Sequence, residues 1–262
     1  MALAAGATAT EAALPAVSMI LLQFGIGAAN DVVDAPRDAG RKPDKPIPAG
    51  LVSRSTAAAI GVACSTLGVV VAAAHGMPLA GLAAVVLAIG LAYDLWLNGT
   101  RWSWVPFAVG IPILPIYGWL AARSALPELT PLILAVAFLE GAALALANGL
   151  VDVERDRGAG DASAASSLGL PRAAWVGLAI QDVVVMAAVI TGWGIGLTRG
   201  SIMVAGVGSL AVLAGAGTSL LAARSSHPSA IERRELGWRI QAIGAAILAF
   251  AWISGAAQLG RL

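Results

Sequence analysis

The chain is poor in charged residues, in cysteine and in histidine. Charged side chains make up 12% of its 262 residues, whereas about a quarter of the residues in an ordinary soluble domain are charged. The single cysteine, Cys64, excludes a disulfide bond within the chain. The two histidines, His75 and His227, fall in predicted loops, and no metal-ligand spacing involves them. The net charge of +1 gives no reason to expect a nucleic-acid partner.

Long apolar runs dominate what is there, since 58% of the residues are hydrophobic. A run of about 20 apolar residues is long enough to cross a bilayer as a helix. Eight such runs lie at about 12–30, 55–74, 78–97, 102–122, 130–150, 172–192, 201–223 and 237–258. The connections are short, and no basic segment or cleavage site precedes the first run, so we expect no cleavable signal peptide. We predict an all-α integral membrane protein, one transmembrane domain over residues 1–262 made of about eight spanning helices.

Two segments of the chain are near copies. Motif one, residues 29–40, reads A-N-D-V-V-D-A-P-R-D-A-G, and motif two, residues 147–158, reads A-N-G-L-V-D-V-E-R-D-R-G; seven of the twelve positions are identical. Each motif closes an apolar run, and four predicted spans separate them, so both helices cross the membrane in the same direction. We therefore predict two parallel four-helix repeats, approximately 12–122 and 130–258, around a central cavity with a shared polar site.

The polar residues of both motifs follow a four-residue spacing that places most of them on one face of a helix. They are Asn30, Asp31, Asp34 and Asp38 in motif one and Asn148, Asp152 and Asp156 in motif two. Carboxylates stacked at this spacing repel one another and need a cation. Mg²⁺ prefers carboxylate, amide and water oxygens and often shares the phosphates of a substrate.

Basic residues alternate with these acids. Arg37 and Arg155 occupy equivalent positions, and Arg41, Lys42 and Lys45 follow motif one. A metal ion combined with guanidinium and ammonium groups is the composition expected of a diphosphate site. A solvated charge cluster would explain the basic residues but not the aligned Asp and Asn residues, so we favour a magnesium–diphosphate site.

The basic residues also predict the orientation in the membrane. Three of the sixteen, Arg123, Arg199 and Arg261, fall on one side of the predicted spans, and the other thirteen fall on the side that carries both motifs. We therefore expect the site to open to the cytoplasm. The scarcity of lysine beside fourteen arginines suggests GC-rich bacterial coding, so we expect a bacterial inner or plasma membrane.

At this point the sequence resembles a known family. N-D-V-V-D-A-P-R-D at Asn30–Asp38, followed by R-K-P-D-K-P-I-P-A-G at Arg41–Gly50, resembles the first signature of the UbiA superfamily of intramembrane prenyltransferases. D-V-E-R-D at Asp152–Asp156 resembles the second signature, D-x-x-x-D. The resemblance covers essentially the whole chain. It implies a barrel-like helical bundle in which two Mg²⁺ ions bridge an isoprenyl diphosphate, whose isoprenyl group passes to an aromatic or lipophilic acceptor inside the membrane.

The resemblance also implies roles for individual residues. The implied metal ligands are Asn30, Asp31, Asp34, Asp38, Asn148, Asp152 and Asp156. The implied diphosphate contacts are Arg37, Lys42, Lys45 and Arg155. Catalytic roles fall on Asp34, Asp38, Asp152, Asp156 and Tyr93.

Two features depart from the family pattern. The family usually has nine spans with motif one on the second, so this chain is either an eight-span member or the product of a start upstream of Met1. In the segment Tyr93–Asn98, Asn98 stands where the family often has a lysine, and Arg101 is the candidate to supply that charge. Tyr93 either contacts a phosphate, lines the cavity or is an interfacial aromatic residue.

Two acids, Glu140 and Asp182, lie several residues inside predicted spans. Ionisable residues at this depth are costly and are functional candidates by default. Glu140 precedes Asp152 by twelve residues, about 18 Å along an ideal helix and about 120° around it, so the two need not share a face. Each acid is either a base in the reaction or a structural residue held by a hydrogen bond within the bundle.

Two other functions remain open at this point. A member of the same family can ionise and cyclise a prenyl diphosphate without an acceptor, as a terpene cyclase. A membrane transporter with repeat symmetry is a more distant alternative, although transporter sites usually lie near the bilayer midplane at broken helices. The D-G-x-x-A-R element of phosphoalcohol transferases is absent from the sequence.

Overall fold

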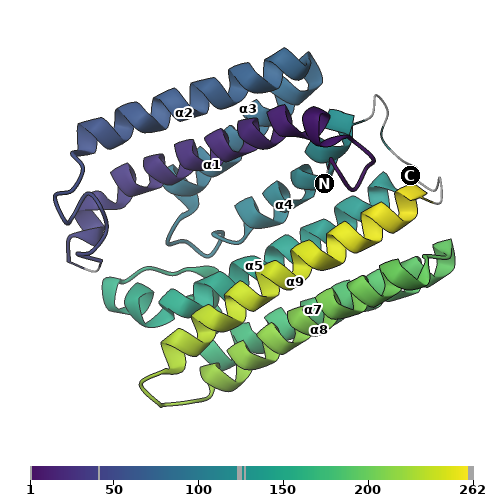
Figure 1. The fold of residues 1–262 in the computed structure, drawn as a ribbon. Helices are drawn as coiled ribbons and strands as arrows, with labels where there is room; N and C mark the ends of the chain where they lie inside the picture. Colours follow the sequence, from purple (N-terminus) through teal and green to yellow (C-terminus); the bar gives the residue numbers. More distant parts are fainter. Residues whose placement is uncertain (1, 41, 123–125, 127, 259–262) are drawn as a thin grey trace. The chain divides into compact units, whose positions relative to one another are not determined.

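The computed structural model describes residues 2–40, 42–122, 126 and 128–258, and over these ranges the chain is helical without a β-strand. Three basic residues used above to predict the orientation and the diphosphate site, Arg41, Arg123 and Arg261, lie outside the described residues. The elements are α1 (Ala9–Asp38), α2 (Arg54–His75), α3 (Met77–Ala92), a π-helical turn η1 (Tyr93–Leu97), α4 (Val105–Ala122), α5 (Thr130–Ala159), α6 (Ala164–Leu168), α7 (Leu170–Ile195), α8 (Arg199–Ala223) and α9 (Ala230–Gln258) (Figure 1).

Each of the eight predicted spans is confirmed as a helix. Eight helices of the described chain are long and apolar enough to cross a membrane. Two of them continue past the apolar runs that predicted them: α1 reaches Asp38 and α5 reaches Ala159. Both motifs therefore sit on the C-terminal turns of spanning helices, and the predicted helical spacing of their acids holds.

The described chain divides into two compact units, one formed by residues 7–98 and the other by the described residues of 1–6 and 99–262. In the smaller unit, α1 and α2 run side by side (Figure 1). The hydroxyl of Ser18 donates a hydrogen bond of 2.7 Å to the carbonyl of Gly68, and a Cβ atom at Gly68 would lie 2.9 Å from Leu22. Small residues thus let the two backbones approach closely, which fixes the helix that carries motif one.

Local sequence signals set the starts of the helices. Thr8 and Glu11 form a capping box at the start of α1, where the backbone N–H of Thr8 donates to Glu11 at 2.8 Å and the N–H of Glu11 donates to the hydroxyl of Thr8 at 3.3 Å. Ser53 accepts from the N–H of Thr56 at 3.0 Å and caps α2. These caps satisfy backbone N–H groups at the starts of the two helices, which have no partner within the helix.

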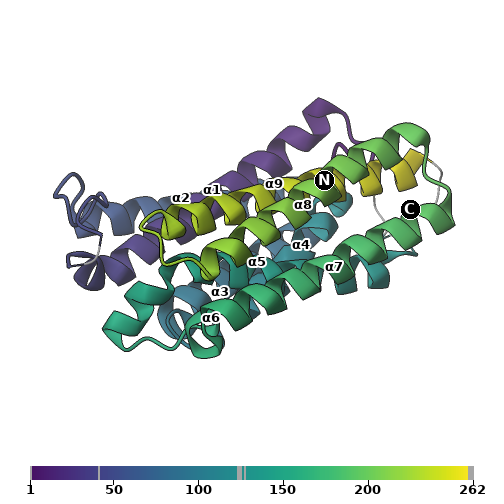
Figure 2. The same ribbon diagram turned by 90° about the horizontal axis from the view of Figure 1, so that it is seen from below.

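In the larger unit, α8 and α9 pack closely along their length (Figure 1). A Cβ atom at Gly215 would lie 2.6 Å from the carbonyl oxygen of Gly237, and one at Gly208 would lie 2.6 Å from the backbone nitrogen of Leu248. Glycine is therefore required at this contact. The short helix α6 lies beside the ends of α5 and α7 (Figure 2).

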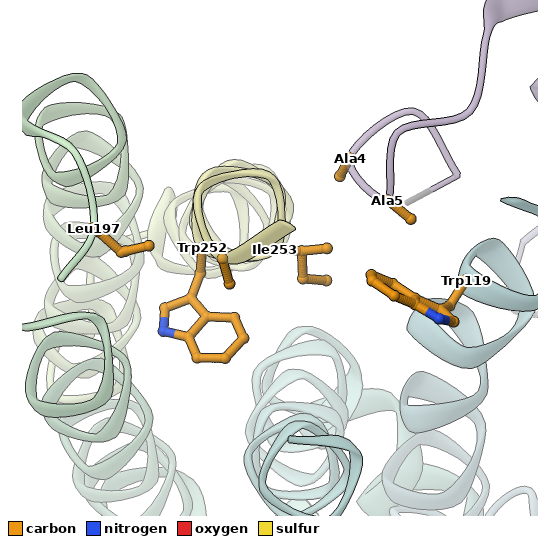
Figure 3. Close-up of a cluster of buried hydrophobic side chains, with 7 residues drawn as sticks. Ala4, Ala5, Trp119, Leu197, Trp252 and Ile253 are labelled. Carbon is orange, nitrogen blue, oxygen red and sulfur yellow. The ribbon is translucent and has the colours of Figure 1, made fainter. Parts of the chain in front are cut away.

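One buried apolar cluster closes the larger unit at the end remote from motif two. The side chains come from the N-terminal segment, from α4, from the loop just after α7, and from α9 (Figure 3). They are Ala4, Ala5, Trp119, Leu197, Trp252, Ile253 and Ala256. The indole nitrogen of Trp252 donates to the hydroxyl of Thr191 at 3.1 Å, which fixes the ring between α9 and α7.

Candidate functional site

Motif one is held together by Lys45, which follows it in the loop after α1. The ammonium nitrogen of Lys45 lies 2.8 Å from Oδ1 of Asp31 and 2.7 Å from Oδ2 of Asp38. Asp38 is buried, whereas Asp31 is half-buried. One cation thus bridges two of the predicted metal ligands and offsets the repulsion between stacked carboxylates.

The charge state of Lys45 follows from these contacts. Partial burial of the ammonium group alone would lower the pKa of Lys45, because it disfavours the charged form. The hydrogen bonds and charges of Asp31 and Asp38 act in the opposite direction and outweigh it, so that the pKa of Lys45 is raised above its ordinary value of 10.5. Lys45 is therefore positively charged at physiological pH, in the loop that follows motif one.

The π-helical turn η1 brings two further polar residues to motif one. The amide of Asn30 donates to Oδ1 of Asp94 at 3.0 Å, and the amide of Asn98 donates to Oδ2 of Asp34 at 3.2 Å. Asp94 is buried, and its second oxygen, Oδ2, has no hydrogen-bond partner among the described residues. Single π-turns in α-helices often occur at functional sites.

Asp94 was not among the residues that the sequence assigned to the site, although its neighbour Tyr93 was. Tyr93 is the first residue of η1 and is half-buried, and its carbonyl accepts from the backbone N–H of Asn98 at 2.8 Å. An acid that ends an apolar run could have signalled Asp94. The predicted role of Tyr93 stays a prediction.

Pro36 shapes the end of α1. A proline inside a helix has no N–H to donate to the carbonyl four residues earlier, which here belongs to Val32. The Nε atom of Arg54, at the start of α2, donates to this carbonyl at 3.0 Å. Arg37 is exposed beside it on the last turn. The backbone N–H of Lys42 donates to the carbonyl of Asp38 at 2.7 Å, which keeps the following loop against the helix end.

Motif two has a different set of partners. Arg155 forms an ion pair with Asp152 on the same helix. Asp156 accepts a hydrogen bond of 2.6 Å from the hydroxyl of Ser163, and Ser163 also caps α6 by accepting from the N–H of Ser166. The loop after α5 therefore folds back over Asp156.

Motif two also differs from motif one in having no counterpart of Asp31. Gly149 occupies the equivalent position, where a Cβ atom would lie 3.0 Å from the Cβ atom of Ala165 in α6. Packing of α6 therefore leaves room only for a small residue. Asn148 lies next to it, half-buried, on the face predicted for it.

Glu154 points away from this face, as its helical position predicts. It pairs at 2.6 Å with Arg234 of α9, which is 1% exposed. Arg101 is exposed, and its guanidinium group lies 5.4 Å from the centre of the Trp102 ring. The predicted contact between Arg101 and a diphosphate stays a prediction.

The oxygen-rich residues of the motifs suit magnesium by their chemistry. Mg²⁺ takes one or two protein carboxylates together with water and substrate phosphates. The buried, unpartnered Oδ2 of Asp94 beside Asn30 is a further acceptor of this kind. Across the described ranges, no group of three or more His, Cys, Asp or Glu side chains is placed to hold a metal ion by itself.

A cavity of about 270 Å³ lies in the larger unit among α4, α5, α7 and α9. Its wall is almost wholly apolar, and Glu140 of α5 is the acid that reaches it. Glu140 is buried and accepts a hydrogen bond of 3.1 Å from the amide of Gln181 in α7.

Asp182, the other intramembrane acid, is exposed on the surface of α7 and does not line this cavity. The structure thus separates two residues that the sequence treated alike. The buried partner of Glu140 is Gln181, the neighbour of Asp182, and sequence reasoning missed it. A lone amide in an apolar span was the available signal.

Over the residues that the structure describes, these features define an all-helical protein with eight candidate membrane spans, paired Asn/Asp/Arg motifs and an apolar cavity. The model of the UbiA prenyltransferase family matches residues 1–238. The chain therefore belongs to the UbiA prenyltransferase family, which confirms the resemblance seen in the sequence. Members of this family are prenyltransferase-type enzymes.

Solved structures show the same fold. A UbiA homologue from Aeropyrum pernix K1 is 22% identical, with 99% of this chain and 93% of that chain covered and a TM-score of 0.70. A UbiA homologue from Archaeoglobus fulgidus, bound to DMAPP and Mg²⁺, is 18% identical over 94% of this chain and 90% of that chain, with a TM-score of 0.66. A structure of digeranylgeranylglyceryl phosphate synthase is 14% identical over 97% of this chain and 88% of that chain, with a TM-score of 0.69. No match was found among curated proteins.

Proposed function

We propose that this protein transfers an isoprenyl group from an isoprenyl diphosphate to a lipophilic or aromatic acceptor within the membrane, in a reaction that depends on Mg²⁺. Its family supports the reaction class. The Archaeoglobus fulgidus homologue, which shares the fold, binds GPP or DMAPP together with Mg²⁺. The observation that carries the proposal is that Lys45, Asn98 and Asp94 contact the Asp and Asn residues of motif one.

Each motif offers both oxygen ligands and cations. The residues proposed to hold Mg²⁺ are Asn30, Asp31, Asp34, Asp38, Asn148, Asp152 and Asp156. The residues proposed to contact the diphosphate are Arg37, Lys42, Lys45, Arg101 and Arg155. Two bound ions would supply the positive charge that stabilises the departing diphosphate.

Lys45 has a specific task in this proposal. Its ammonium group has three N–H donors, and it holds Asp31 and Asp38 together. Asp31 and Asp38 engage two of these donors, which leaves the third for a diphosphate oxygen. Lys45 would thus link the substrate to two acidic residues of motif one.

Allylic diphosphates react by cleavage of the C–O bond to give a delocalised carbocation. Cations near the departing oxygen favour this step, and the proposal gives this role to Lys45 and Arg155. The apolar side chains of the bundle exclude water, which would otherwise capture the cation. Tyr93 of η1 is proposed to contact the phosphate or the allylic carbon chain.

We further propose that both motifs open to the cytoplasmic side of a bacterial inner or plasma membrane, where soluble prenyl diphosphates and Mg²⁺ are present. The distribution of basic residues along the chain supports this orientation.

Mass spectrometry of products tests the function. The purified protein is incubated with Mg²⁺ and isoprenyl diphosphates of graded length, with and without a lipid extract. We expect a product that joins the isoprenyl group to an acceptor and forms only when the extract is present. A product of isoprenoid carbon alone, formed without extract, would instead show a terpene cyclase. Intact diphosphate under all conditions would contradict both.

A further inference from the structure

The cavity of the larger unit contains a polar atom that the proposed diphosphate chemistry does not use. Oε1 of Glu140 accepts the hydrogen bond from Gln181, whereas Oε2 is buried and has no hydrogen-bond partner among the described residues. Glu140 is 8% exposed and lines the cavity. A buried polar atom without a partner destabilises the folded protein, so a ligand that forms a hydrogen bond with this oxygen is favoured.

A chain of polar side chains fixes Glu140 from behind. The amide of Gln181 lies 3.5 Å from Oε1 of Gln241 in α9 and donates to Glu140. The amide of Gln241 in turn donates to the hydroxyl of Ser219 in α8 at 3.3 Å and to the carbonyl of Gly237 at 3.2 Å. Gln181 and Gln241 are 0% and 2% exposed. Such a buried network holds one orientation of the carboxyl group.

The rest of the wall gives the ligand its apolar character. Besides Glu140, the cavity wall includes two side chains with hydrogen-bonding groups, Thr191 and Trp252. The indole nitrogen of Trp252 donates to the hydroxyl of Thr191 at 3.1 Å. Thr191 also donates to the carbonyl of Ala187 at 2.6 Å. Aliphatic side chains such as Leu132 and Val136 supply most of the remaining surface. A ligand of this cavity is therefore a hydrocarbon body with one polar group near Glu140.

Glu140 also limits what that polar group can be. A phosphate or carboxylate would bring acceptor oxygens against an acceptor. An ammonium group has three N–H donors, whereas the cavity wall offers the single unengaged oxygen of Glu140. A hydroxyl group can donate to a carboxylate and accept from a carboxylic acid, so it pairs with Glu140 in either protonation state.

We propose that this cavity is a binding site for a lipophilic alcohol or phenol, with its hydroxyl held by Oε2 of Glu140 and its hydrocarbon body directed toward Trp252. Its volume of about 270 Å³ exceeds the roughly 150 Å³ of an engineered apolar cavity that holds benzene. Glu140 lies about 18 Å along α5 from Asp152, so the hydroxyl site is distinct from the acids of motif two.

Binding of matched probes tests this site in the full-length protein, without Mg²⁺ or diphosphate. The probes are farnesol and farnesene, a matched isoprenoid hydrocarbon that carries no oxygen atom, and affinity is measured by isothermal titration in detergent. We expect farnesol to bind about tenfold more tightly than farnesene, the ratio that one hydrogen bond supplies. Equal affinities would overturn the proposal, because a bound water or the wall alone would then satisfy Glu140.

Variants locate the hydroxyl. Glu140→Leu should lower this ratio about tenfold while farnesene still binds, and Gln181→Met should lower it in part by freeing the carboxyl group to rotate. Asp182→Asn, on the exposed face one residue further, is the control and should keep the ratio. If Glu140→Leu does not fold, Gln181→Met and Ala249→Leu test the location of the hydroxyl in its place. Ala249→Leu narrows the cavity and should weaken both probes equally.

A preference for farnesol that is unchanged in Glu140→Leu, or unchanged in Gln181→Met, would overturn the assignment. A second assay adds Mg²⁺ and an isoprenyl diphosphate. Conversion of farnesol to an ether would place its hydroxyl beside the diphosphate rather than at Glu140, about 18 Å along α5 from Asp152, and would overturn the site; binding without conversion supports it. Because the binding assay contains no diphosphate, its outcome does not depend on the proposed transfer.

Discussion

Asn30 and Asp94, 64 residues apart in the sequence, are joined by a hydrogen bond of 3.0 Å between the amide of one and the carboxyl group of the other. This bond orients the amide of Asn30, so that its carbonyl oxygen remains available as a ligand. We therefore predict that Asp94 acts on motif one through Asn30, as a positioning residue.

Asp94→Asn should raise the Mg²⁺ concentration needed for half-maximal activity and lower turnover about 10–100-fold, the range for partners that orient metal ligands. Turnover is measured as a function of Mg²⁺ concentration, with melting temperature as a check of folding. Leu95→Ala, at an exposed position of the same turn, is the control. An unchanged Mg²⁺ dependence in Asp94→Asn would remove Asp94 from the site.

Asp34→Asn and Asp152→Asn should each lower turnover by at least about 100-fold, because each removes negative charge from a proposed magnesium ligand. The variants should remain extractable and folded. Glu232→Gln, an exposed acid on α9, should leave turnover unchanged. Near wild-type turnover in either aspartate variant would show that its motif does not bind the metal.

Lys45→Met should destabilise the protein at neutral pH and less so at high pH. The folded-state pKa of Lys45 is raised above 10.5, so its stabilisation is complete below about pH 10.5 and is lost as the pH rises through the folded-state pKa. Thermal unfolding of both proteins between about pH 8 and 12 measures this. If the difference between them vanishes near neutral pH instead, another group accounts for it.

Gly215→Ala should lower the free energy of unfolding by about 1–3 kcal/mol, because its Cβ atom would lie 2.6 Å from the carbonyl oxygen of Gly237. Gly217→Ala is the matched control on the same helix, since nothing lies within 4 Å of its Cβ position. It should be neutral or stabilising by up to about 1 kcal/mol through helix propensity. Equal losses in both variants would show that α8 and α9 do not pack in this way.

Single-cysteine labelling in a Cys64→Ser background should show Ala162→Cys accessible from the cytoplasm and Met77→Cys accessible from the outside. Both positions are exposed, and the basic residues gather on the side of residue 162. Labelling of intact cells and of inverted vesicles with a membrane-impermeant maleimide makes the comparison. The reverse pattern would contradict the proposed orientation.

The spans and the motifs could be predicted because each depends on one local quantity. An apolar run of about 20 residues has few alternatives to a membrane helix, and a repeated Asn/Asp pattern needs no knowledge of packing. The roles of Gln181 and Asp182 could not be separated, because adjacent residues lie about 100° apart on a helix and only packing decides which one faces inward. The five-residue helix α6 is too short to leave a span-like signal.

The contacts of Asp94 and Asn98 could not be predicted from the sequence for a related reason. Both depend on the π-turn η1, which changes the angular position of the residues after it. A regular helix projected from the sequence places them elsewhere. The arrangement of the two repeats stays a prediction, as does the shared site of the two motifs.

Pro36 and Glu154 occupy equivalent positions of the two motifs. Each is associated with a contact between its helix and an arginine of another helix. Pro36 leaves the carbonyl of Val32 for Arg54, and Glu154 pairs its own carboxyl group with Arg234. The two copies thus reach the same anchoring by different chemistry, one with the main chain and one with a side chain. Exchanging the two residues would remove both contacts, the one of Arg54 and the one of Arg234. The two motifs of this protein are therefore not interchangeable.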